Sequence, residues 1–430
     1  MGQHHVVVIG GGFAGLNCAS RLLKNPEVHV TLIDQNNYFK FTPFLYQIAT
    51  SALSIEEAAI SFRHYFDNQA RIDIKMAKVV QVEPQNRTVT TEEGKSYTGD
   101  YLVLACGSTP QFFDLQGAKE YSFPLYNLVD AERLRSRILS VFEEADRDPA
   151  KIDQGVLNFV IVGAGATGTE VAGSLADMMR VALPKEFKDL SLAKAAIYLV
   201  DHAPAVLSAF ATDSQSYAQN VLKERGVQLK LGLLVKKIGD GYVILSNGEK
   251  ILSQTVIWAG GLQAEPLAGH CGLTQGHGGR INTLSDLSVA GFPQVYAVGD
   301  MSNMPGPKGK PLPQLASVAK QAGEWAARNI LADISGTKTA PFQYDDRGIM
   351  AMIGRDAAVA EIGEKRKKIE GIMAYVSWLF IHASLLPTIR QRMGAIWEWA
   401  WAYFSRMPSL QILDRQDAAR IEWNPKDKNP

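Results

Sequence analysis

The sequence predicts an α/β protein in which a buried strand, a glycine-rich turn and a helix follow one another twice. The first copy lies in residues 4–34 and the second in residues 157–201. Each opens on a short β-branched run, which is typical of a strand buried on both faces. Each ends in a second strand that finishes at an aspartate, Asp34 or Asp201. Such an internal repeat is far more specific than either copy alone.

In the first copy, Gly10, Gly12 and Gly15 stand at the spacing G-x-G-x-x-G. This spacing lets two backbone segments and a pyrophosphate come within contact distance, because no Cβ atoms intervene. It also aims the free N–H groups of the helix at the anion. Asp34 follows at roughly the twenty-residue distance expected of a carboxylate that binds a ribose hydroxyl. The stretch therefore predicts a dinucleotide site rather than a glycine turn in an unrelated α/β protein.

The second copy repeats the spacing at Gly163, Gly165 and Gly168 and carries Asp201 after its second strand. A carboxylate there accepts hydrogen bonds from a ribose 2′-hydroxyl and repels a 2′-phosphate, whereas an arginine would attract the phosphate. Residues 202–204 supply no arginine. We therefore expect the second site to prefer NADH to NADPH.

The rest of the chain alternates between further strands and helices. Buried strands are predicted at 101–110, 255–261 and 292–300, half-exposed strands at 72–90, a β-rich segment at 232–251, and helices at 13–23, 130–145, 169–179 and 316–331. The aromatic stretch 35–53 predicts a hydrophobic loop, either packed on the first domain or forming a wall beside a flat ring ligand. Four prolines in residues 301–313 exclude regular structure there.

Composition narrows the class of protein. At 430 residues the chain is long enough for two or three domains, and its 44 basic and 44 acidic residues give no global charge that would favour nucleic acid. Cys18, Cys106 and Cys271 lie far apart, without C-x-x-C or a Cys/His cluster. We expect a reducing compartment, no dithiol mechanism and no metal. Cys106, inside a predicted apolar strand, is expected to be a core residue. The N-terminus lacks a signal-peptide pattern, which favours the cytosol or the cytoplasmic face of a membrane.

Five segments stand in one order: GGGFAG with Asp34, LACGSTP, GAGATG with Asp201, TVIWAGG and VYAVGD. In this order they resemble the two-dinucleotide-binding-domain flavoproteins, over all but the C-terminal part of the chain. The resemblance implies a Rossmann-like FAD domain interrupted by a second Rossmann-like domain for NADH. It also implies that Asp34 binds the adenosine ribose of a non-covalent FAD and that Asp300 binds its ribityl chain.

Three further features are similar to the type II NADH:quinone oxidoreductases: FTPFLYQIAT after the first acid, GATGTEVAGSLAD around the second turn, and an amphipathic tail. The resemblance implies that Glu170 lies near the nicotinamide and flavin rings. By position alone, Glu170 would be a first-turn acid favoured by the helix dipole. The family commonly has A-Q-x-A-x-Q after the Pro-rich loop, its first glutamine facing the quinone. Ser317 replaces that glutamine here, and Gln314 or Gln321 could compensate.

The resemblance assigns candidate residues to each task. Glu170 is the candidate catalytic residue. FAD and NADH would be bound by Gly10, Gly12, Phe13, Ala14, Gly15, Asp34, Ala105, Gly107, Gly163, Gly165, Thr167, Gly168, Glu170, Asp201, Gly260, Gly299, Asp300 and Ser317. The quinone would contact Tyr46, Gln47, Gln314, Ser317, Gln321 and His382. The expected domains are an FAD domain at 1–115 and 285–345, an NADH domain at 116–284, and a membrane-associating region at 346–430.

The tail combines apolar, aromatic and basic residues. Residues 372–389 approach the length of a membrane span, but His382 and Pro387 interrupt them. Three tryptophans follow, and basic residues flank the region: Trp397, Trp399 and Trp401; Arg390, Arg392, Arg406 and residues 365–368. This pattern favours amphipathic helices lying on a lipid bilayer surface. The alternatives are a true span, or helices buried against the FAD domain or in a homodimer.

The predicted function is that of a peripheral membrane enzyme that takes a hydride from NADH onto FAD and passes two electrons to a membrane quinone, without proton pumping. Glu170 or His382 could relay the protons that quinone reduction needs. Three alternatives remain. A sulfide:quinone oxidoreductase would need a cysteine pair beside the flavin, a soluble ferredoxin reductase would not need the tail, and a redox sensor would keep FAD without turnover. The identity of the quinone is left open.

Overall fold

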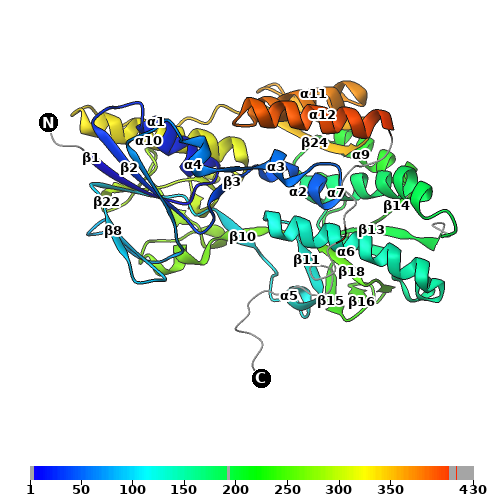
Figure 1. Ribbon diagram of the computed structural model, residues 1–430. Helices are drawn as coiled ribbons and strands as arrows, with labels where there is room; N and C mark the ends of the chain where they lie inside the picture. Colours follow the sequence, from blue (N-terminus) through cyan, green and yellow to red (C-terminus); the bar gives the residue numbers. More distant parts are fainter. Residues whose placement is uncertain (1–3, 191–193, 406–412, 414–430) are drawn as a thin grey trace. The chain divides into compact units, whose positions relative to one another are not determined.

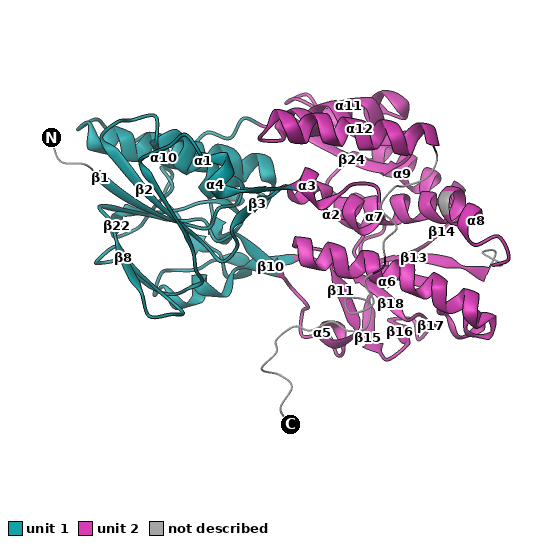
Figure 2. Cartoon of the chain, viewed as in Figure 1, with its two compact units in different colours: residues 1–40, 59–109, 262–345 teal, residues 41–58, 110–261, 346–430 magenta. Residues whose placement is uncertain are grey.

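Figure 1 shows the computed structural model of the 430-residue chain, which describes residues 4–190, 194–405 and 413. The chain forms two compact units, coloured separately in Figure 2. Unit 1 comprises Met1–Lys40, Ala59–Thr109 and Leu262–Asp345, and unit 2 comprises Phe41–Ala58, Pro110–Gly261 and Asp346–Pro430. Each glycine turn therefore belongs to a unit of its own.

A six-stranded sheet forms the centre of unit 1, in the order β21-β22-β9-β1-β2-β5. All neighbours in it pair in parallel except β21 with β22. The strands are β1 (His4–Ile9), β2 (Val28–Asp34), β5 (Ile72–Met76), β9 (Tyr101–Leu104), β21 (Ser288–Val289) and β22 (Phe292–Ala297). Because the carboxyl ends of parallel strands meet at one edge, the residues after β1, β9 and β22 come together there.

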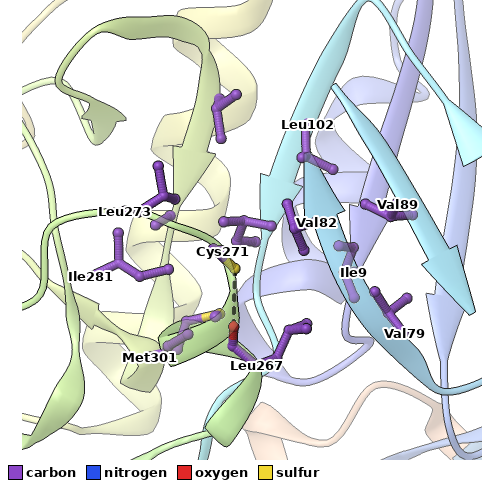
Figure 3. Close-up of a cluster of buried hydrophobic side chains, with 14 of the residues drawn as sticks. Ile9, Val79, Val82, Val89, Leu102, Leu267, Cys271, Leu273, Ile281 and Met301 are labelled. Atoms are coloured by element: carbon purple, nitrogen blue, oxygen red, sulfur yellow. Dashed lines mark hydrogen bonds between the residues drawn. The ribbon is translucent and has the colours of Figure 1, made fainter. Parts of the chain in front are cut away.

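Alternate residues of β1 face opposite cores. Val8 faces the helix α1 (Phe13–Leu22), which packs closely against α10 (Ala316–Ile334), since a Cβ on Gly323 of α10 would overlap the carbonyl oxygen of Ala14. Val7 and Ile9 belong to the core on the other face, shown in Figure 3. That core also takes residues from the antiparallel sheet β6 (Val79–Glu83), β7 (Thr88–Thr91) and β8 (Ser96–Thr98) and from residues 264–281.

Shorter elements complete unit 1. They are β3 (Tyr38–Lys40) paired with β4 (Ala59–Ser61), α4 (Phe62–Tyr65), β20 (Ile281–Asn282) paired with β23 (Ser302–Asn303), and the 3₁₀ helices Pro266–His270, His277–Gly279, Gly299–Met301 and Pro307–Gly309. The chain leaves and re-enters the unit at β10 (Ser108–Pro110) and β19 (Leu262–Ala264).

Unit 2 is built on a five-stranded parallel sheet in the order β11-β18-β12-β13-β14. These strands are β11 (Ser122–Pro124), β12 (Asn158–Val162), β13 (Ala196–Asp201), β14 (Val227–Leu231) and β18 (Thr255–Trp258). Its helices are α2 (Leu45–Ala49), α3 (Ile55–Ala58), α5 (Ala118–Tyr121), α6 (Leu128–Arg147), α7 (Ala166–Asp177), α8 (Leu183–Glu186) and α9 (Thr212–Glu224), with 3₁₀ helices at Thr42–Phe44 and Pro149–Gln154 and a π-helical segment at Met178–Ala182. β15 (Val235–Gly239), β16 (Tyr242–Leu245) and β17 (Lys250–Leu252) form an antiparallel meander.

The C-terminal part of unit 2 begins with an antiparallel sheet, β24 (Gly348–Gly354), β25 (Ala357–Ile362) and β26 (Lys367–Glu370). β24 lies against α7, because a Cβ on Gly173 would overlap the carbonyl oxygen of Ile353. Two helices follow, α11 (Ile372–Leu385) and α12 (Ile389–Ser405). No helix among the described residues is long and apolar enough to cross a membrane.

The α/β fold with parallel sheets is confirmed, and several local expectations are corrected. Residues 35–53 are not a loop, because β3 pairs with β4 and the aromatic side chains of Thr42–Ala49 are buried in unit 2. Cys106 lies after β9 rather than inside it, and α7 begins at Ala166, three residues before the predicted start. The Pro-rich loop still forms β23 and a 3₁₀ turn.

Three segments fall outside the domains expected from sequence, and the shortest of them is 110–115, which was assigned to the first domain and belongs to unit 2. Residues 262–284 were assigned to the second domain, but they belong to unit 1, where Leu267, Cys271 and Ile281 are buried in its core. Residues 41–58 were assigned to the first domain and belong to unit 2. The region 346–430 is not all helical, because its first part is the sheet β24–β26. Arg406, one of the expected basic flanks, lies outside the described residues.

Candidate functional site

Two glycines of the first turn lie where no side chain fits. Gly10 has a φ of +91°, and a Cβ on it would overlap the carbonyl oxygen of Ala105, just after β9. A Cβ on Gly15 would overlap the carbonyl oxygen of Gly10. Glycine at both positions lets the turn pass between β1, β9 and α1.

Gly12 is different, because nothing lies within 4 Å of the place where its Cβ would stand. It is the N-cap of α1, with extended backbone and no side-chain cap, so the first N–H groups of the helix remain for an anion. Phe13 and Ala14 begin the helix, and the Phe13 ring packs edge-on against Phe39 at 5.1 Å. A side chain on Gly12 would fill the space that a dinucleotide pyrophosphate needs.

Asp34 ends β2 beside this turn. Its Oδ2 accepts the N–H of Gly11 at 2.7 Å, and its Oδ1 accepts the N–H of Asn36 at 2.7 Å. Burial raises the pKa of the Asp34 carboxyl, and these hydrogen bonds oppose the rise. The carboxylate is thus fixed at the end of the strand where a ribose hydroxyl would be bound.

The segments after β9 and β22 complete the same edge of the sheet. Gly299 has a φ of +72°, and a Cβ on it would lie 3.1 Å from the Cβ of Ala14. The next residue, Asp300, accepts the hydroxyl of Ser108 on Oδ2 at 3.0 Å. Ala105 and Gly107 precede that serine. The structure therefore brings together four segments that are far apart in sequence, and this edge fits FAD.

The second turn has the same design in unit 2. Gly163 has a φ of +103°, and its Cβ would overlap the carbonyl oxygen of Ala259, while a Cβ on Gly168 would overlap that of Gly163. Gly165 has nothing within 4 Å, and it caps α7 without a side-chain hydrogen bond. Gly260 follows Ala259 after β18, the sheet neighbour of β12.

Asp201 ends β13 and closes the second turn as Asp34 closes the first. It accepts the N–H of Ala164 at 2.5 Å and the N–H of Ala203 at 2.7 Å. Thr167 is exposed in the first turn of α7. The turn, its acid and the open helix N-terminus fit NADH in the same way as the first set fits FAD.

Glu170 lies one turn further along α7, in apolar surroundings. Its Oε1 accepts the N–H of Met352 on β24 at 3.3 Å. Burial raises the pKa of this carboxyl to about 8. The indole of Trp378 on α11 favours the charged form of Glu170, although its N–H falls short of hydrogen-bond geometry. This raised pKa favours the protonated form of Glu170 at neutral pH.

Aromatic rings gather around Trp378, whose indole lies close to this acid. The Tyr46 ring lies 6.1 Å from that of Trp378, and the ring of His382 stacks on Trp378 at 3.8 Å. His382 Nδ1 bonds to the carbonyl oxygen of Trp378 at 2.8 Å, and burial lowers the pKa of its imidazole to about 4. Burial raises the pKa of Tyr46, and the Glu170 carboxylate raises it further when it is ionised.

A cavity of about 150 Å³ lies beside this cluster, within unit 2. Its lining is mostly apolar and comes from α2, α7, β24, α11 and α12; Tyr46, Gln47, Met352, Tyr375 and Trp399 are among the residues that line it. Two charged groups, Asp177 and Arg355, also line it. An apolar space with a few converging polar groups is the usual form of a small-molecule site.

The other expected quinone contacts belong to unit 1, where the side chain of each one makes a hydrogen bond to another residue of that unit. Gln314 donates to the carbonyl oxygen of Asp300 at 3.0 Å. Ser317 shares a hydrogen bond of 2.9 Å with the hydroxyl of Tyr344. Gln321 exchanges two hydrogen bonds with the backbone of Asp345, at 3.0 and 2.9 Å.

Sequence reasoning missed Trp378, Trp399, Met352 and Tyr375. The two tryptophans lie in the stretch that predicts membrane helices, so they were assigned to the lipid side, yet Trp378 is fully buried. The only available signal was that Trp399 lies two residues from Trp397 and from Trp401, which puts it on a different side of a helix.

The three cysteines are free. Cys106 packs against the core cluster that holds Cys271, so these two lie closer together than their separation in sequence suggests. Burial raises the pKa of the Cys271 thiol to about 12, and it raises the pKa of Cys106 and Cys18 as well. A raised pKa disfavours the thiolate that disulfide chemistry needs.

Comparison with known proteins decides between the related families. The family model described as pyridine nucleotide-disulphide oxidoreductase matches residues 4–323. The type II NADH:quinone oxidoreductase Ndh of Mycobacterium tuberculosis is 33% identical over 97% of this chain and 92% of its own length. The chain belongs to the type II NADH:quinone oxidoreductases.

Other members of this family agree. A type II NADH:quinone oxidoreductase of Staphylococcus aureus is 29% identical over 84% of this chain and 90% of its own length. The structure of NDH2 from Plasmodium falciparum in complex with NADH has a TM-score of 0.86 at 18% identity, covering 94% of this chain and 98% of that one. The sulfide:quinone oxidoreductase of Aquifex aeolicus shares the fold, with a TM-score of 0.74, 19% identity and coverage of 93% and 95%.

Proposed function

We propose that this protein is a FAD-dependent NADH:quinone oxidoreductase that works at the cytoplasmic face of a membrane as a peripheral enzyme. One observation carries the proposal: in the unit that carries the second dinucleotide turn, an apolar cavity is lined by Tyr46 and by Met352, whose N–H is bonded to the carboxyl of Glu170. Family membership and two complete dinucleotide turns support it.

The residues divide the work between the two units. In unit 1, the turn at Gly10–Gly15, Asp34 and Asp300 hold FAD, and in unit 2 the turn at Gly163–Gly168 and Asp201 hold NADH. Bound FAD supplies the redox chemistry, because it accepts two electrons with a hydride and releases them to an oxidant. The protein's own contribution is to bind, orient and provide protons.

Glu170 is the better proton donor of the two candidates. Reduction of a quinone to a quinol takes two electrons and two protons. A carboxyl whose pKa is about 8 still holds its proton at neutral pH and can give it up near that pH. His382, with a pKa of about 4, is neutral there and its Nδ1 is already bonded to Trp378. We assign His382 to packing and Glu170 to proton transfer.

The helices α11 and α12 carry a surface suited to lipid. Their outward side chains include large apolar residues that are all at least 47% exposed: Ile372, Met373, Val376, Phe380, Leu385, Ile389, Met393, Ile396, Trp397, Trp401 and Phe404. Arg390, also exposed, lies among them. Many exposed apolar side chains on two successive helices, with an exposed arginine among them, fit the headgroup region of an anionic bilayer, where quinone is dissolved.

The activity is tested by separating its two halves under anaerobic conditions. NADH should bleach the bound flavin, and a short-chain ubiquinone or menaquinone analogue should then restore it rapidly. Reoxidation by ferredoxin but by no quinone would indicate a ferredoxin reductase, and reduction by sulfide in place of NADH would indicate a sulfide:quinone oxidoreductase. A flavin that NADH reduces but no acceptor reoxidises would indicate a redox sensor.

Membrane docking is tested by point substitution, because deleting α11 and α12 would also remove a wall of the cavity. The triple variant Met393→Ser, Trp401→Ser, Phe404→Ser should lower binding to anionic phospholipid vesicles at least about tenfold, since each side chain loses apolar contact area. The control variant Met76→Ser, Leu234→Ser removes equally exposed apolar side chains elsewhere. Equal sedimentation of both variants with vesicles would place the docking surface elsewhere.

A further inference from the structure

One tryptophan of α12, Trp399, makes a hydrogen bond to another helix of unit 2, and the proposed lipid contact of α12 does not account for this bond. Trp399 Nε1 donates to Oε1 of Gln47 on α2 at 2.7 Å. Its ring packs edge-on against Phe44 at 5.5 Å and near Trp378 at 6.2 Å. Trp397 and Trp401, on either side of it in sequence, are exposed. Trp399 thus points inward from a helix whose other face is open.

This hydrogen bond determines how Gln47 is oriented. An indole N–H can only donate, so it engages the amide oxygen of Gln47 and turns the amide NH₂ the other way. The amide Nε2 then donates to the hydroxyl oxygen of Tyr46 at 3.0 Å. Gln47 is 5% exposed, so no other orientation of its amide is satisfied by water.

The chain of hydrogen bonds ends at Tyr46. Because its hydroxyl oxygen accepts from Gln47, the hydroxyl hydrogen of Tyr46 is left to donate in another direction. Tyr46, Gln47 and Trp399 all line the cavity, and Tyr46 is close enough to Glu170 for the carboxylate to act on its hydroxyl. Trp399 is therefore connected through two side chains to the polar groups beside the protonated acid.

We propose that Trp399 is a positioning residue for the acceptor half-reaction: through Gln47 it fixes the direction in which Tyr46 presents its hydroxyl to a quinone in the cavity. The inference rests on the proposed function, because it takes a quinone as the occupant. It also couples the seating of α12 to turnover, since a helix lifted from the unit would withdraw the indole N–H and release the Gln47 amide.

The test is Trp399→Phe, which keeps an aromatic ring against Phe44 and removes the N–H. Trp325→Phe is the matched control, because Trp325 donates a bond of similar length, 2.9 Å, to the carbonyl oxygen of Ala340 in unit 1. The two half-reactions are measured by stopped flow on the full chain with bound flavin, using NADH and then a water-soluble short-chain quinone. Such a quinone removes any need for membrane docking.

We expect Trp399→Phe to slow flavin reoxidation by quinone about tenfold, as the loss of one positioned hydrogen bond allows, and to leave flavin reduction by NADH unchanged. Trp325→Phe should leave both rates unchanged. Gln47→Leu, which does not alter α12, should slow reoxidation similarly. The double variant should lose no more than either single variant, because both break one chain of hydrogen bonds.

Equal reoxidation by Trp399→Phe and the wild type would overturn the proposal. Slowing of both half-reactions in that variant would also overturn it, since this indicates a structural role alone, and so would additive losses in the double variant. A wild-type flavin that NADH reduces but no quinone reoxidises would overturn the proposed function itself, and the positioning role with it.

Discussion

The two glycine turns share one backbone and differ in what surrounds them. In both, the first glycine has a positive φ beside the carbonyl oxygen after a neighbouring strand, the second faces open space, and the third packs on the first. In both, an aspartate accepts an N–H from the residue between the first two glycines, Gly11 or Ala164. This local geometry follows from sequence alone.

The surroundings of the first turn cover it more completely. Gly10, Gly11, Ala14 and Gly15 are buried, and the Phe62 ring lies where a Cβ on Gly11 would stand. In the second turn, by contrast, residues 165–167 are exposed. A covered turn suits a cofactor that stays bound, and an open turn suits a substrate that must leave after each cycle. Burial of the turn, rather than its glycine motif, therefore distinguishes the proposed FAD site from the proposed NADH site.

The residue two positions after the third glycine also differs. In α1 it is Asn17, whose side chain donates to the carbonyl oxygen of Phe13 at 2.7 Å within its own helix. In α7 it is Glu170, which bonds to Met352 on another element. The hydrogen bond of Asn17 therefore stays within α1, whereas that of Glu170 connects α7 to β24, whose Met352 lines the cavity.

The largest expected effects come from adding a side chain to the second glycine of each turn, which faces open space. Gly12→Val and Gly165→Val should both fold, because nothing lies within 4 Å of either new Cβ. Gly12→Val should be purified without flavin, since the valine occupies the pyrophosphate space. Gly165→Val should keep its flavin and raise the KM for NADH at least about tenfold, ~1.4 kcal/mol.

Flavin absorbance per protein and steady-state kinetics distinguish these outcomes. Circular dichroism checks that both variants fold. Loss of flavin from Gly165→Val but not from Gly12→Val would reverse the assignment of the two turns.

Coenzyme preference offers the next largest effect. Asp201 should make kcat/KM for NADH about a hundredfold higher than for NADPH, because its carboxylate repels a 2′-phosphate. Asp201→Asn should reduce that ratio about tenfold, since an amide still accepts the ribose hydroxyl without the charge. Asp34→Asn is the matched change in the first turn, and it should alter flavin retention without altering the ratio. Comparable turnover of NADH and NADPH by the wild type would contradict this reading.

Proton delivery should show a smaller effect. With the pKa of Glu170 near 8, flavin reoxidation by quinone should fall as the pH rises past about 8, because the protonated carboxyl is the donor. Glu170→Gln should lower reoxidation about tenfold at neutral pH and remove this dependence on pH. Stopped-flow rates between pH 6 and pH 9 provide the measurement. Unchanged rates across that range would remove Glu170 from proton transfer.

Much of each turn could be predicted from sequence, because its parts are local. Gly10, Gly15 and Asp34 act within one strand-turn-helix segment, and Gly163, Gly168 and Asp201 within another. The close approach of Gly299 to Ala14 does not follow from any local pattern, because the order of strands in the sheet brings the two residues together. Only the family resemblance placed their segments in one domain.

The acceptor side could not be predicted in the same way. Burial raises the pKa of Glu170, while its contacts with Met352 and Trp378, from two other elements, oppose the rise. No periodicity in the sequence records such contacts. The tail pattern, likewise, correctly indicated helices but could not say which tryptophan points inward, because both faces of α12 are largely apolar. The two tryptophans differ only in their surroundings, because Trp397 is exposed whereas Trp399 is partly buried.

The smallest expected effect concerns stability, and it separates Glu170 from Asn17. Burial raises the pKa of Glu170 from 4.5 to about 8. Between these values the native protein holds a proton that the unfolded chain has lost. The resulting stabilisation is complete below pH 4.5, falls as the pH rises through this window and is lost above about 8. Asn17 carries no such dependence.

The free energy of unfolding of Glu170→Gln should therefore increase relative to that of the wild type between pH 6 and pH 9. Each kcal/mol gained would appear as roughly 2–4 °C in the melting temperature of a unit of this size. Glu143→Gln, an exposed carboxyl on α6, controls for the loss of one acid. A difference in melting temperature that is the same at both pH values would show that Glu170 is ionised in the folded protein, and the second turn would then differ from the first by its cover alone.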